Sequence, residues 1–198
     1  MAEHERRTTP GKVERQADPG ATPQLRGYAA VFNQETTIGD FFREVILPGA
    51  FAAAVARDDV RADFNHEPNL VLGRTKAGTL RLREDDHGLA YEVDLPDTSY
   101  ARDLAVSVDR GDVSQSSFMF DVTGEAWDYP AAGSGQLPLR KITGVKLYDV
   151  APVTFAAYES TSVSARAMAL KDARPEMAPV DPTAALLLEQ IALDEAEA

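Results

Sequence analysis

The sequence predicts a mainly β, α+β fold: a closed or strongly curled, mostly antiparallel β-barrel with two or more flanking helices. Between residues 24 and 161 the chain is dense in short segments in which apolar and polar residues alternate, the period of a half-buried strand. Only two helical patterns interrupt these segments, and closing the sheet would leave no strand edge exposed. No GxGxxG or GxxxxGK[ST] motif is present, so a nucleotide-binding βαβ domain does not fit.

The clearest element is a β-hairpin. Apolar residues alternate over 79–83 and again over 89–95, and the Asp-Asp-His-Gly segment between these two stretches is typical of a turn. The same alternation predicts further strands at residues 25–32, 42–47, 60–64, 70–75, 113–122 and 139–153. Helices are expected at residues 49–57, behind Pro48, and at about 99–110, which Gly111 ends.

Both ends of the chain differ from this body. Residues 1–23 show no apolar period and predict a flexible leader before a folded domain over residues 24–165. Residues 166–181 are expected to be a linker, because residues 171–182 carry three prolines and almost no large apolar group. Residues 182–198 predict an amphipathic C-terminal helix that needs a surface to cover its apolar stripe.

The composition excludes several kinds of partner and cofactor. Lys and Arg number 20 against 32 Asp and Glu, a net charge of −12, which repels nucleic acid and anionic membranes. There is no cysteine, so disulfides, thiolate zinc sites and iron–sulfur clusters are excluded. The segment His66-Glu67 begins like the zinc motif HExxH but lacks its second histidine. We therefore expect a cytosolic protein with no metal, no cofactor, no nucleic-acid partner and no membrane partner.

His66 is the best candidate for a general base among the three histidines. His4 lies in the leader and His87 in the hairpin turn, where solvated side chains are common. His66 directly follows the strand expected at 60–64, and strand ends are where scaffolds mount functional groups. The alternative is an ordinary loop histidine.

Ser117 is the candidate nucleophile. It lies in VSQSSFMF (residues 113–120), where the phenylalanines mark one face of a strand and Ser117 points to the other. Serine is seldom favoured in strands, so Ser114, Ser116 and Ser117 indicate either a solvent-facing strand or a functional site. A serine becomes a nucleophile only when a base accepts its proton and a third group orients that base.

Asp149 is the best candidate for that third group. It stands among apolar residues in KLYDVAPVTF, where a carboxylate is costly unless it accepts a hydrogen bond. The alternative is an edge-strand acid that faces water. The other carboxylates considered for the same role are Glu44, Glu67 and Asp63.

Seven ordered motifs resemble those of the tailed-phage prohead maturation protease family, which is itself similar to the herpesvirus capsid maturation protease (assemblin). They are GYAAVFN (27–33), EVILPGAF (44–51), NHE (65–67), LGRT (72–75), GTLRLREDDHGL (78–89), RGDVSQSSFMF (110–120) and LYDVAPVTFAAY (147–158). By position, the family's histidine matches His66 and its serine matches Ser117. Its acid matches Asp149, with Ala151 where the family often has serine and Met119 where it often has glycine.

The resemblance implies a herpesvirus-protease-like fold and a serine endopeptidase. Such an enzyme would cleave scaffold, the N-terminal segment of the major capsid protein, and itself, in the host cytoplasm inside the assembling procapsid. Major capsid protein and scaffold are then the expected partners, a homodimer is an option, and no cofactor is needed. Backbone N–H groups or Arg140 are candidates for stabilising the oxyanion. The alternatives are a catalytically inactive β-barrel module that binds capsid or scaffold, and an unrelated serine hydrolase.

Overall fold

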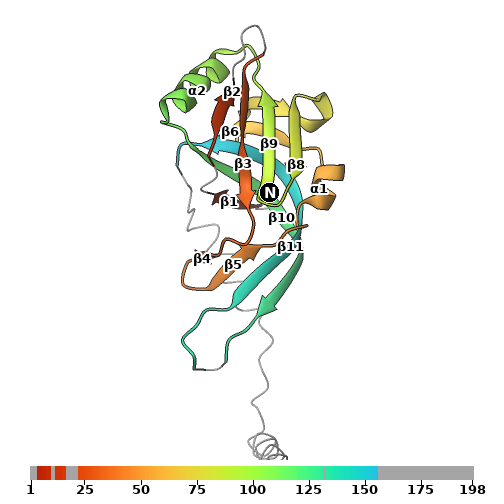
Figure 1. Cartoon of the computed structure of the whole chain (residues 1–198), viewed down its shortest axis with the longest axis vertical. Helices are drawn as coiled ribbons and strands as arrows, with labels where there is room; N and C mark the ends of the chain where they lie inside the picture. Colours follow the sequence, from red (N-terminus) through yellow and green to blue (C-terminus); the bar gives the residue numbers. More distant parts are fainter. Residues whose placement is uncertain (1–3, 10–11, 17–21, 132, 156–198) are drawn as a thin grey trace, which may run out of the picture.

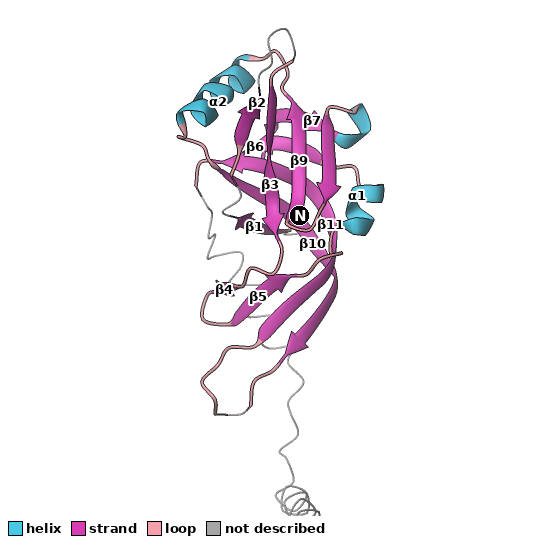
Figure 2. Ribbon diagram, in the orientation of Figure 1, coloured by secondary structure: helices cyan, strands magenta, loops and turns pink. Residues whose placement is uncertain are grey.

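The structure is a computed structural model that describes residues 4–9, 12–16, 22–131 and 133–155 (Figure 1). The described strands form two sheets, and two α-helices and the 3₁₀ helix η1 (Thr75–Ala77) flank them (Figure 2). The seven-stranded sheet contains β1 (Glu5–Thr9), β4 (Thr36–Ile38), β5 (Phe42–Ile46), β6 (Arg61–Phe64), β7 (Glu67–Arg74), β10 (Gln115–Asp128) and β11 (Leu139–Val153). The four-stranded sheet contains β2 (Glu14–Gln16), β3 (Gln24–Val31), β8 (Leu80–Glu84) and β9 (Gly88–Asp94).

The long strand β11 organises the larger sheet. It pairs antiparallel with β10 along most of its length, and it pairs parallel with β5 near its start and with β6 near its end. The order of the main path is β1-β10-β11-β5-β4, with β6 joining β11 to β7. Because β6 and β10 both flank the end of β11, residues from these three strands can meet there.

The core lies between the two sheets. Figure 2 shows β3, β9 and β8 crossing in front of the larger sheet. Fully buried side chains from both sheets, such as Leu89 and Val93 on one side and Phe118 and Val150 on the other, belong to one apolar cluster. Helix α1 (Ala52–Arg57) packs near β11, and α2 (Ser99–Arg110) packs near β2 with Leu104 and its neighbours buried.

The predicted closed or strongly curled barrel is wrong. The fold is mostly β with two α-helices, but the strands form two open sheets, and neither sheet pairs its first strand with its last. Two of the edge strands, β2 and β4, are only three residues long, so each of them exposes little edge to pairing with another chain. Edge strand β8 carries the exposed Arg81 and Arg83, which also oppose pairing with another chain.

The flexible leader is wrong for two described parts of residues 1–23. β1 pairs with β10 and β2 pairs with β3, and Val13 is buried in the core. The predicted hairpin is confirmed, since β8 and β9 pair antiparallel from Leu80↔Val93 to Glu84↔Leu89. The expected linker at 166–181 and the helix at 182–198 lie outside the described residues.

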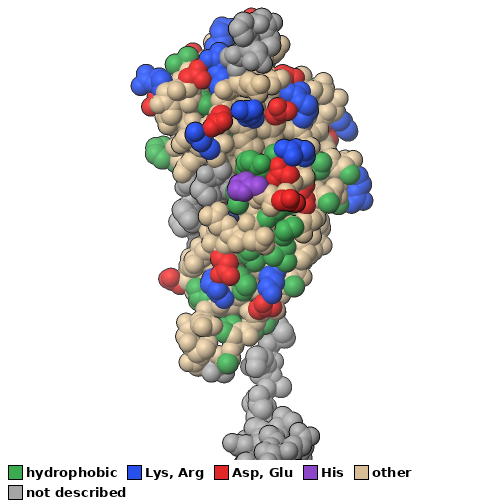
Figure 3. Space-filling view, viewed as in Figure 1, with side chains coloured by type: hydrophobic (Ala, Val, Ile, Leu, Met, Phe, Trp, Pro, Cys, Tyr) green, Lys and Arg blue, Asp and Glu red, His purple; other side chains and the backbone are tan. Residues whose placement is uncertain are grey.

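The charged side chains on the face drawn in Figure 3 are of both signs and interspersed. Among the described residues, no helix is both long enough and apolar enough to cross a membrane.

Candidate active site

His66 lies in the tight turn between β6 and β7. The turn is Asn65-His66, flanked by the paired residues Phe64 and Glu67, and both turn residues have positive φ (58° and 56°). A two-residue hairpin of type I′ requires positive φ at both positions, and Asn and His adopt it more readily than most residues. The turn is tied to the end of β11, because the Asn65 N–H donates to the Pro152 carbonyl (3.1 Å) and Asn65 Oδ1 accepts from the Thr154 N–H (2.9 Å).

Ser117 lies on β10 beside this turn. Ser117 pairs with Ala151 on β11 and is only 2% exposed. Ala151 directly precedes Pro152, whose carbonyl accepts the hydrogen bond from the Asn65 N–H. Phe118 and Phe120 are fully buried and stack with ring centroids 4.7 Å apart, which fixes this part of β10 against the core. Ser117 Oγ lies 2.7 Å from His66 Nε2.

Asp149 completes a continuous chain of contacts. Its Oδ1 lies 2.7 Å from His66 Nδ1, and both side chains are about one-twentieth exposed (6% for His66, 5% for Asp149). Asp149 is not an edge-strand acid, because β11 is paired on both sides here, with Met119 of β10 and Arg61 of β6. The structure thus brings Ser117, His66 and Asp149 together in one chain of contacts, with His66 in the middle.

The proton positions follow from the donors available. Asp149 as a carboxylate only accepts, so Nδ1 of a neutral His66 carries the hydrogen and Nε2 is left to accept the Ser117 hydroxyl. Ser117 Oγ is also 3.0 Å from the carbonyl oxygen of Arg7. The hydroxyl has a single hydrogen, so it donates either to His66 or to the Arg7 carbonyl.

Asp63 is a fourth residue of the site, and the sequence placed it only among alternatives to Asp149. It lies on β6, is 5% exposed, and its Oδ1 has no hydrogen-bond partner. Burial, and next the charge of Asp149, raise the pKa of Asp63 to about 8. Ligand atoms of Asp63, His66 and Asp149 lie within 4.8 Å of one another, so in the described part of the chain these are the residues that could hold a metal ion.

The remaining candidates lie elsewhere or do something else. Glu67 is exposed and accepts from Asn69, and Glu44 is buried in a separate group of charges. Arg140 belongs to that group, where its guanidinium donates to Glu5, Glu44 and Glu125 rather than to the Ser117 region. His87 is exposed in the β8–β9 turn, and His4 lies 3.0 Å from an oxygen of Asp121.

Comparison with known proteins identifies the family. The family model described as caudovirus prohead serine protease matches residues 11–174. That span includes all the residues that meet around His66. Searches among curated proteins and among solved structures each found no match. By this match, which covers most of its length, the chain belongs to the caudovirus prohead serine protease family.

Proposed function

We propose that Ser117, His66 and Asp149 form a Ser-His-Asp triad in an endopeptidase that cleaves scaffold, the N-terminal segment of the major capsid protein, and itself. The observation that carries this proposal is the continuous chain from Ser117 Oγ through both nitrogens of His66 to Asp149, with each contact at 2.7 Å. Hydrogen-bond contact between nucleophile and base, with the base oriented by a third group, is the arrangement that activates a serine.

In this mechanism His66 accepts the Ser117 proton as Oγ attacks a peptide carbonyl. The imidazolium that forms is stabilised by Asp149 and then donates its proton to the leaving amine. Water, activated by the same imidazole, releases the acyl group and restores the Ser117 hydroxyl. The low exposure of all three side chains keeps these contacts in a low-dielectric environment, where they are stronger than in water.

The family places the enzyme inside the assembling procapsid. We propose that residues 24–165 contain the catalytic residues of the protease and that residues 166–181 link it to a C-terminal helix that binds scaffold or shell. The net charge of −12 disfavours binding to nucleic acid, and a serine protease of this family is expected to act on the protein components of the procapsid.

The test is to incubate the full chain with the capsid and scaffold proteins of its own phage and to measure product masses. Wild type and Ser114→Ala should cleave, since Ser114 is an exposed serine on the approach to β10. Ser117→Ala should lose activity on the order of 10⁶-fold and Asp149→Asn about 10⁴-fold, as in other serine proteases.

Two results would contradict the proposal. If Ser117→Ala cleaves at the wild-type rate, Ser117 is not the nucleophile. If the wild type cleaves neither protein under assembly conditions, the chain is instead an inactive module that binds capsid or scaffold.

A further inference from the structure

The N-terminal strand β1 lies directly against the candidate nucleophile. It pairs antiparallel with β10, with Thr8 opposite Ser117 and Arg7 opposite Phe118. The carbonyl oxygen of Arg7 is 3.0 Å from Ser117 Oγ, and the carbonyl carbon is bonded to that oxygen at about 1.23 Å. An extended peptide that adds to the open edge of a sheet, with one carbonyl at the nucleophile, is how a protease binds a substrate strand.

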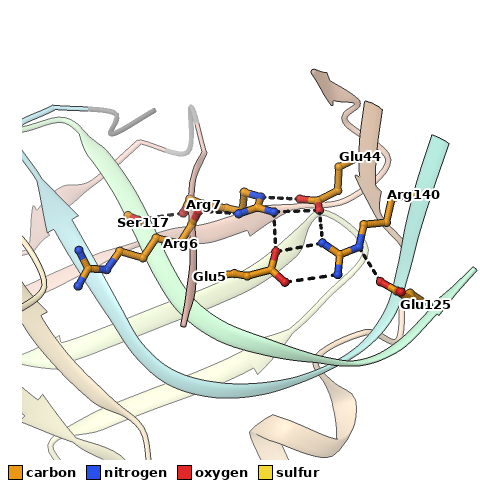
Figure 4. A network of polar contacts seen from close by, with 7 residues as sticks. All are labelled: Glu5, Arg6, Arg7, Glu44, Ser117, Glu125 and Arg140. Carbon is orange, nitrogen blue, oxygen red and sulfur yellow. Dashed lines mark hydrogen bonds and ion pairs between the residues drawn. The ribbon is translucent and has the colours of Figure 1, made fainter. Parts of the chain in front are cut away.

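Arg7 places its side chain in a buried acidic subsite (Figure 4). Its Nε donates to one oxygen of Glu44 (2.6 Å) and its Nη2 to the other (3.0 Å), the paired geometry in which Arg recognises a carboxylate. The guanidinium also lies 5.5 Å from the ring centre of Phe120. Arg7 and Glu44 are 10% and 3% exposed, so this contact is largely removed from water.

Glu5, two residues earlier on the same face of β1, meets a buried cation. Its carboxylate accepts from Arg140 at 3.0 Å and 3.3 Å, and it also accepts from Arg7 at 2.7 Å. Strand alternation explains why Glu5 and Arg7 share this face, whereas Arg6 points away from the group in Figure 4.

The partners of Glu44 show what the subsite needs. Apart from β1, the group consists of the carboxylates Glu44 and Glu125 and the single cation Arg140. Arg140 donates to only one oxygen of the buried Glu44, so a strand that lacked a basic residue here would leave the other oxygen of Glu44 without the hydrogen bond that Arg7 gives it. Arg7 supplies the second cation, and Glu5 then fills the remaining donors of Arg140.

We propose that β1 occupies the substrate groove, and that this groove selects peptides in which Arg supplies the scissile carbonyl and Glu stands two residues before it, so that the enzyme cleaves its own Arg7–Thr8 bond. The proposal rests on Ser117 being the nucleophile. Ser117 Oγ bonds to the Arg7 carbonyl carbon, the bond to the Thr8 nitrogen breaks, and His66 moves the serine proton to that nitrogen. Water then hydrolyses the ester, which yields the Arg7 carboxylate and restores the hydroxyl.

The experiment uses the full chain as enzyme and the peptide of residues 2–11, AEHERRTTPG, as probe, with cleavage followed by mass spectrometry. Arg6→Ala and Arg7→Ala peptides form a matched pair, since both have the same composition and charge. We expect cleavage between Arg7 and Thr8, a loss of about 100-fold with Arg7→Ala, about tenfold with Glu5→Ala, and a clearly smaller loss with Arg6→Ala than with Arg7→Ala, because the charge of Arg6 acts near Asp63 and not in the Glu44 subsite. The intact chain should yield the same new N-terminus at Thr8, and Ser117→Ala should yield none.

The outcomes separate this proposal from the function it rests on. Equal rates for the Arg6→Ala and Arg7→Ala peptides would overturn the substrate rule. So would Ser117-dependent cleavage of the capsid protein with no Thr8 product from either the peptide or the chain, and both of these results leave the protease function standing. If the wild type cleaves nothing at all, both the substrate rule and the protease function fall.

Discussion

At the residue scale, the raised pKa of Asp63 determines how much negative charge lies beside His66. The pKa of Asp63 is raised to about 8 by burial first and by the charge of Asp149 second, while a hydrogen bond from the His66 backbone and the charge of Arg6 oppose this shift. Near neutral pH Asp63 therefore holds a proton. A neutral Asp63 adds no second negative charge beside the contact between Asp149 and His66 Nδ1.

Asp63 should make stability depend on pH. In the unfolded chain it ionises near pH 3.8 and in the folded protein near pH 8, so between these values only the folded state holds the proton. Its contribution to the free energy of unfolding is therefore complete below about pH 4 and is lost as pH rises through 8. Asp63→Asn cannot ionise, so it should exceed wild type by about 1–3 kcal/mol at pH 8 and match it near pH 4.

Urea unfolding from pH 4 to pH 9 measures this effect. Asp86→Asn, an exposed carboxylate in the β8–β9 turn, is the control and should leave the curve of wild type unchanged. If the free energy of unfolding changes with pH in the same way for wild type and Asp63→Asn, Asp63 is charged in the folded protein.

The sequence indicates His66, Ser117 and Asp149 because each stands where an apolar alternation is interrupted by a group that can do chemistry. The structure brings these three side chains together, and their catalytic roles stay a prediction. Glu5 and Arg7 are not predictable in the same way. Their segment has no apolar period, and their places depend on pairing with β10, which is distant in the sequence.

At the element scale, the β6–β7 turn positions His66. Asn65 and His66 both adopt positive φ, and Asn65 Oδ1 accepts hydrogen bonds from the N–H and the hydroxyl of Thr154. These contacts fix the turn to the end of β11, the strand that also carries Asp149. The orientation of His66 is therefore set by the backbone of the turn as well as by its own two hydrogen bonds.

Substitutions of Asn65 should separate the backbone effect from the hydrogen bonds. Asn65→Gly removes the contacts to Thr154 but tolerates positive φ, whereas Asn65→Ala removes the contacts and adds strain. We expect Asn65→Ala to be less stable than Asn65→Gly by about 1 kcal/mol and to lose more peptidase activity. Chemical unfolding and hydrolysis of the capsid substrate measure both quantities, and wild-type behaviour of Asn65→Ala would show that the turn does not position His66.

The strands that the sequence predicts are stabilised by the burial of alternate side chains, whereas those that it misses depend mainly on backbone pairing. β8 and β9 each show apolar alternation over their full length, and both were expected. β1, β2 and β4 have three to five residues and depend on backbone pairing with a longer neighbour. Such pairing leaves little trace in side-chain polarity, so periodicity alone does not reveal these strands.

At the scale of the whole molecule, alternation shows that a strand buries one face but not which strand it pairs with. For this reason the sequence supports a mostly β fold and yet predicts a barrel where the structure has two open sheets. A buried hydrogen bond joins the two sheets at β10, the strand that carries Ser117. The Tyr91 hydroxyl on β9 lies 2.9 Å from Ser116 Oγ on β10, and these residues are 2% and 0% exposed.

Removing either partner of this bond should weaken the packing of one sheet on the other. Tyr91→Phe leaves the Ser116 hydroxyl buried without a partner, and Ser116→Ala does the same to the tyrosine, so each should lower the free energy of unfolding by about 1–3 kcal/mol. The double variant removes both polar groups and should be more stable than the sum of the two losses implies, by about 1 kcal/mol. Urea unfolding of wild type, the two single variants and the double variant measures this departure from additivity. Strictly additive losses would mean that the contact does not join the sheets, and a coupled loss accompanied by slower hydrolysis would show that sheet packing also holds Ser117 in place.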